Sequence, residues 1–112
     1  MKCQECSASI EYTPWDAPDS IHHCGPGVHF VTTPGHGGFV VDQWQNNLIP
    51  RELKLASFNG QGCRGFYEED CDWAIPVAYL PQWFKSQQVI EAREFVVEHF
   101  KPEPALRWRQ PC

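Results

Sequence analysis

Cysteines and histidines near the N-terminus are the first residues whose types and spacing could do chemistry. Cys3 and Cys6 form a Cys-x-x-Cys pair, which can place two thiolates on one metal ion. His22 and Cys24 could complete a tetrahedral structural zinc site. The sequence has no second Cys-x-x-Cys, so the alternative is a pair of exposed thiols at a frayed end. Other residues that could replace the later ligands are His23, Cys63 and Cys71.

A histidine in a glycine-rich turn is the second candidate. His36 lies in the segment PGHGG, where a backbone with little side-chain bulk can approach a ligand closely. Near neutral pH its imidazole can act as a base or as a metal ligand. The structural alternative is that the glycines supply positive φ angles for a hairpin, and that His36 bonds a nearby carbonyl or carboxylate.

The acidic segment GFYEEDCDWAI is the third candidate. Glu68 or Glu69 could join His36 as a metal-binding or acid/base group. The structural alternative is a helix that begins at Asp70 or Asp72, because carboxylates at a helix N-terminus accept hydrogen bonds from free N–H groups. A nucleophilic pair of Cys71 and His36 is also conceivable, although the neighbouring acids disfavour a thiolate.

The elements that must position these residues predict an α+β fold. The sequence favours strands at residues 27–33 and 39–42, joined as a hairpin, and a third strand at residues 65–70. A short helix is expected at residues 49–57, another from Asp70 or Asp72 to Pro81, and an amphipathic helix at residues 86–100 with Ser86 as its N-cap. We therefore expect a small antiparallel sheet of about three strands, with two or three helices on one face.

The 112 residues fit one domain with three parts. Residues 1–27 read as a loop-rich segment, residues 28–100 as the α+β core, and residues 101–112 as a basic tail. No apolar run approaches the roughly 20 residues that span a membrane, and the N-terminus lacks the apolar stretch of a secretory signal. These features predict a soluble, cytoplasmic protein that does not bind membranes, and its thiols are expected to be reduced or metal-bound.

The order of several segments resembles a known family. These segments are TPWD at residues 13–16, PGVHFVTTPGHGGFVV at residues 26–41, IP at residues 49–50 and FYEEDCDWAIPVAYLP at residues 66–81. They are similar to a domain of unknown function from bacterial phage, plasmid and other mobile-element proteins. The resemblance covers about residues 12–100 and implies a mobile-element setting, in which small acidic proteins often antagonise host defence. It implies no established activity.

The net charge of −5 bears on possible partners. An acidic surface is repelled by phosphate backbones, so direct binding of nucleic acid is not expected. The same surface suits a basic patch on a host protein, and Glu68, Glu69 and Asp72 are the expected contacts. Together with the resemblance, this predicts a non-enzymatic inhibitor of a bacterial defence system, such as an anti-CRISPR, in the host cytoplasm. The alternative is a metal-dependent hydrolase or transferase that uses His36 and the acids from Glu68 to Asp72.

Overall fold

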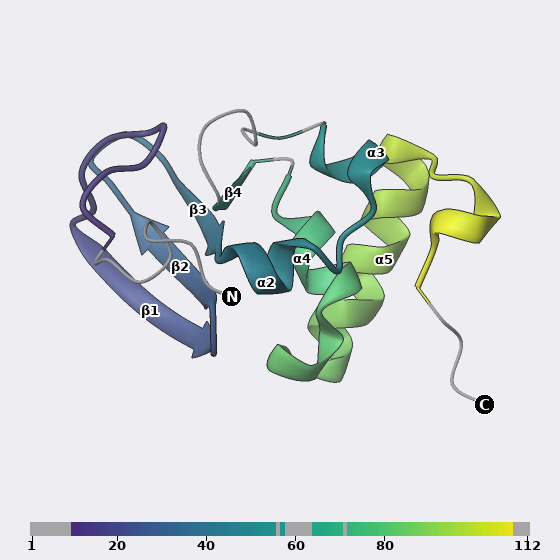
Figure 1. Cartoon of the computed structure of the whole chain (residues 1–112). Coiled ribbons are helices and arrows are strands. Elements are labelled where there is room, and N and C mark those ends of the chain that lie inside the picture. The colour runs from purple at the N-terminus through teal and green to yellow at the C-terminus, as the bar shows by residue number, and fades with distance from the viewer. Residues whose placement is uncertain (1–9, 56, 58–63, 71, 109–112) are drawn as a thin grey trace.

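A four-stranded antiparallel sheet forms one side of the molecule within the part of the chain that the structure describes (Figure 1). The structure is a computed structural model and describes residues 10–55, 57, 64–70 and 72–108. The strands, in sheet order, are β1 (Ser20–Gly25), β2 (Val28–Thr32), β3 (Gly37–Val41) and β4 (Gly65–Glu68). The predicted hairpin and the predicted strand before the acidic segment are therefore confirmed, and β1 adds a strand to the sheet.

Strand β1 lies within residues 1–27, which the sequence predicted to be loop-rich, so that prediction is wrong for residues 20–25. Its residues are mostly exposed and polar, and they show no apolar alternation that would indicate a strand. The strand forms because a tight turn folds it back on β2, with Gly25 opposite Val28. Pro26 and Gly27 make this turn, and Gly27 has a φ of 74°, which glycine adopts without the steric cost of a Cβ.

The helices lie beside the sheet and cover one of its faces (Figure 1). Helix α5 (Ser86–Phe100) has the predicted bounds, although its N-cap is Lys85 and not Ser86. The shorter elements are α2 (Gln43–Asn46), α3 (Arg51–Lys54), α4 (Ala74–Tyr79), and the 3-10 turns η1 (Pro81–Trp83) and η2 (Pro104–Leu106). Helix α4 begins at Ala74, later than either predicted start, and Pro76 falls in its first turn, where proline is tolerated.

Apolar side chains pack on both faces of the sheet. The larger cluster joins the sheet to α4 and α5, and its buried members include Val28, Tyr67, Leu80 and Val96. The smaller cluster lies on the opposite face and consists of Ile10, Val31, Val40 and Phe66, with Trp15 packed against them. Trp15 meets Phe66 edge to face, with 6.2 Å between the ring centroids. Ile10 and Trp15 thus lie on the face of the sheet opposite the helices.

The start of the basic tail also packs on the helices. Trp108 contacts Tyr79, with ring centroids 5.8 Å apart, and the Arg93 guanidinium lies 4.9 Å from the Trp108 ring centroid. Within the described residues, no helix has both the length and the apolar character needed to cross a membrane.

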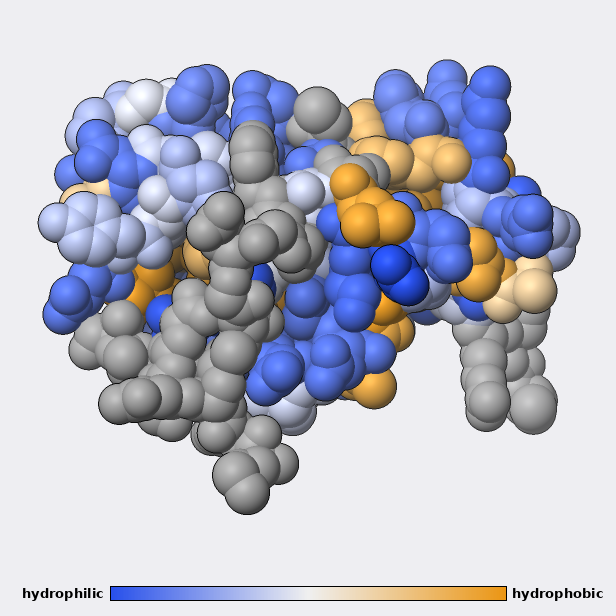
Figure 2. Space-filling model, turned by 45° about the horizontal axis from the view of Figure 1, so that its top comes forward, coloured by the Kyte–Doolittle hydropathy of each residue, from blue (hydrophilic) through white to orange (hydrophobic). Residues whose placement is uncertain are grey.

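The face of the molecule drawn in Figure 2 is mainly hydrophilic. Hydrophobic residues lie on this face in separate groups between the hydrophilic ones. Leu48 and Leu55 are among the exposed large hydrophobic residues, with 61% and 72% of their surface accessible. Because scattered apolar residues of this kind are normal on protein surfaces, the charged groups are the more informative feature.

Candidate functional site

The turn between β2 and β3 holds His36 at the edge of the sheet. The Thr33 backbone N–H donates to the His36 carbonyl at 2.8 Å, and the Thr33 hydroxyl donates to the same carbonyl at 2.5 Å. The His36 backbone N–H donates in return to the Thr33 hydroxyl oxygen at 3.1 Å. These bonds fix the backbone of His36, while its side chain stays 56% exposed.

The glycines that follow His36 have a different role from the predicted one. Among the described residues, Gly27 is the glycine with a positive φ, so Gly37 and Gly38 do not supply that conformation to the hairpin. A Cβ at Gly38 would lie 2.2 Å from the Tyr67 carbonyl oxygen, and one at Gly37 would lie 2.7 Å from the Val31 carbonyl oxygen. These positions require glycine because neighbouring backbone approaches too closely for a side chain.

The structure brings His36 together with two acids at the end of β4. Strand β4 pairs antiparallel with β3, so the residues that follow β4 lie beside the turn that precedes β3. His36 Nδ1 lies 3.8 Å from Glu68 Oε1. One nitrogen of His36 and one carboxylate oxygen each of Glu68 and Asp70 all lie within 4.8 Å of one another. An imidazole and two carboxylates at this spacing could hold a divalent cation.

Glu69 lies next to this group. Its backbone N–H donates to the Gly37 carbonyl at 2.9 Å, which extends the pairing of β3 and β4 by one bond. Its side chain is exposed, and its Oε2 would lie 3.2 Å from a Cβ at Gly37. We call Glu68, Glu69 and Asp70 the acidic edge. Cys71, the predicted nucleophile, lies outside the described residues.

Asp72 is separated from the acidic edge by burial. It is 8% exposed, and its burial together with the nearby Glu68 charge raises its pKa to about 6. The Ile75 backbone N–H donates to the Asp72 carbonyl, so the residue leads into α4, but α4 itself begins at Ala74. Asp72 is therefore poorly placed to meet a partner's basic surface, in contrast to its predicted role as a contact.

A second group of charged and polar side chains was not predicted from the sequence. His23 and His29 face each other across β1 and β2, with 2.7 Å between their Nδ1 atoms. On its other side, His29 Nε2 lies 3.6 Å from Asp42 Oδ2, and Arg64 Nε donates to Asp42 Oδ1 at 3.1 Å. We call these four residues the buried row, because Asp42 and Arg64 are 7% and 6% exposed, although His23 at its end is exposed.

Charge and burial act against each other on His29. Its burial lowers its pKa, the negative charge of Asp42 opposes that effect, and the nearby His23 adds to it. The balance is a lowered pKa, so the neutral imidazole of His29 is favoured. A neutral imidazole can donate one hydrogen bond and accept another, which suits a position between a carboxylate and a second histidine.

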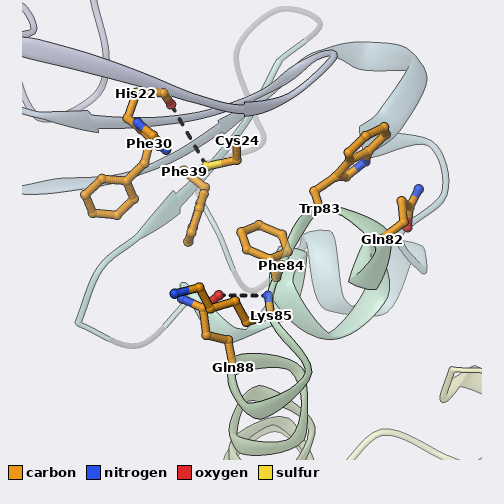
Figure 3. Close-up of a pocket in the computed structure, with 9 residues that line it drawn as sticks. All are labelled: His22, Cys24, Phe30, Phe39, Gln82, Trp83, Phe84, Lys85 and Gln88. Atoms are coloured by element: carbon orange, nitrogen blue, oxygen red, sulfur yellow. Dashed lines mark hydrogen bonds between the residues drawn. The ribbon is translucent and has the colours of Figure 1, made fainter.

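The predicted ligands His22 and Cys24 lie on the opposite face of β1, at a cavity of about 680 Å³ (Figure 3). Phe30 and Phe39 line it from the sheet, and Trp83, Phe84 and Lys85 line it from the helical side. Phe39 stands between Phe30 and Phe84, with centroid distances of 5.0 Å and 5.5 Å. Burial raises the pKa of the Cys24 thiol, which disfavours the thiolate that a metal needs. Cys3, Cys6 and Cys63 lie outside the described residues.

No local sequence pattern predicts the buried row. Asp42 directly follows β3, and Arg64 directly precedes β4, so the pairing of these two strands brings them together across 22 positions. The histidines are six residues apart and meet because of the turn at Pro26 and Gly27. His29 is half-buried in a strand whose other residues are buried or half-buried, and this burial does not identify its partners.

Comparison of the chain with curated proteins and with solved structures gave no significant match. A family model matches residues 8–108, which include the sheet, the helices and both groups of histidines and acids. Because this match spans most of the chain, the protein belongs to the family described as Domain of unknown function (DUF7007).

Proposed function

We propose that this protein acts without catalysis, by binding a host protein through its acidic edge. The observation that carries the proposal is the charge of this edge. Glu69 and Asp70 are exposed, Glu68 is partly exposed, and among the described residues no lysine or arginine forms an ion pair with them. Hydrated carboxylates that have no lysine or arginine partner among the described residues are available to a basic partner.

The partner in this proposal is a basic surface of a protein in a bacterial host cell. The net charge of −5 adds long-range attraction toward such a surface, which mainly increases the association rate. A basic surface that normally holds nucleic acid suits this chemistry, so the proposed role is inhibition of a nucleic-acid-binding defence complex, such as a CRISPR effector. The mobile-element setting and the cytoplasmic location belong to this proposal and rest on the resemblance of the sequence.

Charge reversal at two sites provides a matched test. The double variant Glu69→Lys and Asp70→Lys should no longer recover the host partner in pull-down. Its affinity for the partner should fall by at least about tenfold, because two lysines then face a basic surface. The control is Glu94→Lys with Glu98→Lys, two exposed acids on α5 whose reversal changes the net charge equally. The control should bind within a few-fold of wild type at the same salt concentration.

Two results would contradict this proposal. Equal loss of affinity in the test and control variants would show that net charge matters and that the acidic edge does not. Recovery of no host protein in stoichiometric amounts by the wild-type protein would remove the basis for a binding function. Both variants should keep the wild-type melting temperature, because the substituted side chains are exposed.

A metal-dependent hydrolase or transferase is a second candidate, and the convergence of His36, Glu68 and Asp70 favours it. In that case the three side chains would hold the cation, and Glu69 would be the adjacent base. The variant His36→Ala should then stay folded, bind Mn²⁺ more weakly in calorimetry and lose its effect on the host cell. The control His99→Ala, at the exposed end of α5, should lose neither property.

The same variant separates the two candidates. If His36→Ala keeps full partner binding and its full effect on the host cell, the enzymatic candidate is wrong and the binding proposal stands. If His36→Ala keeps partner binding but loses both Mn²⁺ binding and its effect on the host cell, partner binding alone does not explain the function.

A further inference from the structure

A small cavity next to α5 carries two cationic side chains and no acidic one among the described residues that line it. Its volume is about 390 Å³, and it is lined by Arg93 from α5 and by Arg107, which follows η2. The segment with η2 turns back beside α5 (Figure 1), which brings these two arginines to one place. The rest of the wall consists of Tyr79, Trp108 and apolar residues such as Leu48. The positive charge of this cavity contrasts with the net charge of −5 of the chain.

Each guanidinium of the cavity is held in place by its Nε atom. Arg93 Nε donates a hydrogen bond to the Ala78 carbonyl at 3.2 Å, and Arg107 Nε donates to the Pro102 carbonyl at 3.2 Å. Within the described part of the chain, the terminal NH2 groups of both side chains donate no hydrogen bond. These groups belong to the planar fork with which arginine binds carboxylates and phosphates. Both forks are therefore oriented by the fold and available to a ligand in the cavity.

The charge of Arg93 is partly desolvated without an ion-pair partner. Its guanidinium lies 4.9 Å from the Trp108 ring centroid, and its burial lowers its pKa, an effect that the nearby Tyr79 opposes. Among the described residues, no carboxylate forms an ion pair with Arg93 or Arg107. The buried Arg64, in contrast, is paired with a carboxylate. An anion in the cavity would supply the opposite charge that Arg93 lacks.

Both positive charges also act on the Tyr79 hydroxyl, which places them close to each other. This hydroxyl donates to the carbonyl of Leu106, the residue before Arg107, at 2.7 Å. Burial raises the pKa of Tyr79, and the positive charges of Arg107 and Arg93 both oppose that effect. Two like charges near one point repel each other, whereas an anion that contacts both of them is attracted by both. The electrostatics of the cavity therefore favour a negatively charged ligand.

We propose that Arg93 and Arg107 together bind the phosphate group of a small phosphate ester. A phosphate group carries about −1.5 to −2 charges near neutral pH and has three acceptor oxygens, which match two guanidinium forks better than a singly charged carboxylate does. The cavity is at the lower end of the about 300–1,000 Å³ typical of ligand sites, so the organic part of the ester is small. The Trp108 ring and the apolar wall are placed to contact that part. The site shares no residue with the acidic edge, so this inference does not depend on the proposed function.

Calorimetry with phenyl phosphate tests this inference, because the probe combines a phosphate group with a small apolar group. Wild-type protein should bind close to one phenyl phosphate per chain at about pH 8 and low ionic strength. Arg107→Gln should weaken the affinity by at least about tenfold, since it removes one of the two forks. The matched control Lys85→Gln changes the net charge equally, but at the N-terminus of α5, and should bind within about twofold of wild type. Both side chains are exposed, so both variants should fold as wild type does, which circular dichroism can verify.

Two further probes identify the part of the ligand that is recognised. Inorganic phosphate should bind more weakly than phenyl phosphate, because it does not contact the apolar wall, and phenol should show no measurable binding. The inference is overturned if wild-type protein shows no saturable binding of phenyl phosphate up to about 10 mM. It is also overturned if Lys85→Gln weakens binding as much as Arg107→Gln does, since net charge alone would then explain the affinity. Equal affinity for inorganic phosphate and phenyl phosphate would contradict the assignment to an ester.

Discussion

Two groups in this protein combine histidine with carboxylate, and they differ in what surrounds the negative charge. In the buried row, Asp42 is 7% exposed and contacts Arg64, which is 6% exposed. At the acidic edge, Glu68 and Asp70 face His36, whose side chain is 56% exposed. In the buried row the carboxylate is therefore internal and is compensated by an arginine. At the acidic edge the carboxylates are hydrated, and no lysine or arginine among the described residues pairs with them.

This difference bears on the roles proposed for the two groups. A charged side chain inside the protein must be paired with an opposite charge. The free energy lost when it is removed from water is larger than the free energy that an ion pair at the surface contributes. Asp42 and Arg64 thus have a reason to exist within the fold, since they connect the end of β3 to the start of β4. The acids of the edge contact no lysine or arginine among the described residues, and the proposed function assigns them to the binding of a partner.

The largest expected effect tests whether the buried row is structural. The variant Asp42→Ala removes the carboxylate that Arg64 and His29 contact, and leaves the Arg64 charge buried without it. The free energy of unfolding should fall by about 3–5 kcal/mol, as for other buried charge pairs that lose one partner. Urea denaturation measures this change. A loss below about 1 kcal/mol would contradict the structural role of the row.

Asp72 is intermediate between the two groups, because it is buried and close to Glu68. Its pKa is raised from 3.8 to about 6 in the folded protein, so ionisation is disfavoured there relative to the unfolded chain. The protonated Asp72 carboxyl therefore stabilises the folded protein fully at low pH. This stabilisation is lost as the pH rises from near 4 through about 6. Asp72→Asn cannot ionise and should be more stable than wild type above pH 7, by about 1–3 kcal/mol.

The pH dependence provides the control for that prediction. Well below the unfolded pKa of 3.8, Asp72 is protonated in both states, so Asp72→Asn and wild type should differ there only by the effect of the amide itself. Urea denaturation at about pH 2.5 and at about pH 8 measures the difference. A variant that is equally stable relative to wild type at both values would show that the Asp72 carboxyl does not carry the raised pKa.

The smallest expected effect is at the acidic edge itself. Asp70→Asn changes an exposed side chain and should alter the free energy of unfolding by less than about 0.5 kcal/mol. The free energy of unfolding should rise, because the substitution removes one of several neighbouring negative charges. Thermal unfolding at low ionic strength would detect this best. A loss above 1 kcal/mol would mean that the edge, like the buried row, is part of the fold.

The hairpin and the long helix followed from local patterns. The β-branched and aromatic residues of β2 and β3, and the turn between them, predicted their pairing. The apolar spacing of residues 86–100 predicted α5 and Pro102 predicted its end, while the N-cap lies one residue before the predicted Ser86. Strand β1 was missed because its side chains are mostly exposed and polar, and the Pro26–Gly27 turn was the one local signal of its return.

The candidate site was predicted in part. His36 and Glu68 were considered together on the basis of residue type, and the structure places them 3.8 Å apart. Asp70 was one of the acids that the enzymatic alternative groups with His36, and it lies near His36 and Glu68, while Asp72 was expected to contact a partner and is buried. Whether a single carboxylate is buried depends on which element folds over it. The sequence of the short acidic segment does not predict which of its acids is covered.

The amino-acid sequence by itself determined the α+β class, the hairpin, the long helix and the concentration of acids after the third predicted strand. These depend on side-chain shape, turn residues and periodicity, which act over a few residues. Only the tertiary structure decided which histidine meets which carboxylate, because that depends on strand order and register. The buried row shows this most clearly, since its members come from β1, β2, the end of β3 and the start of β4, and antiparallel pairing alone makes them neighbours.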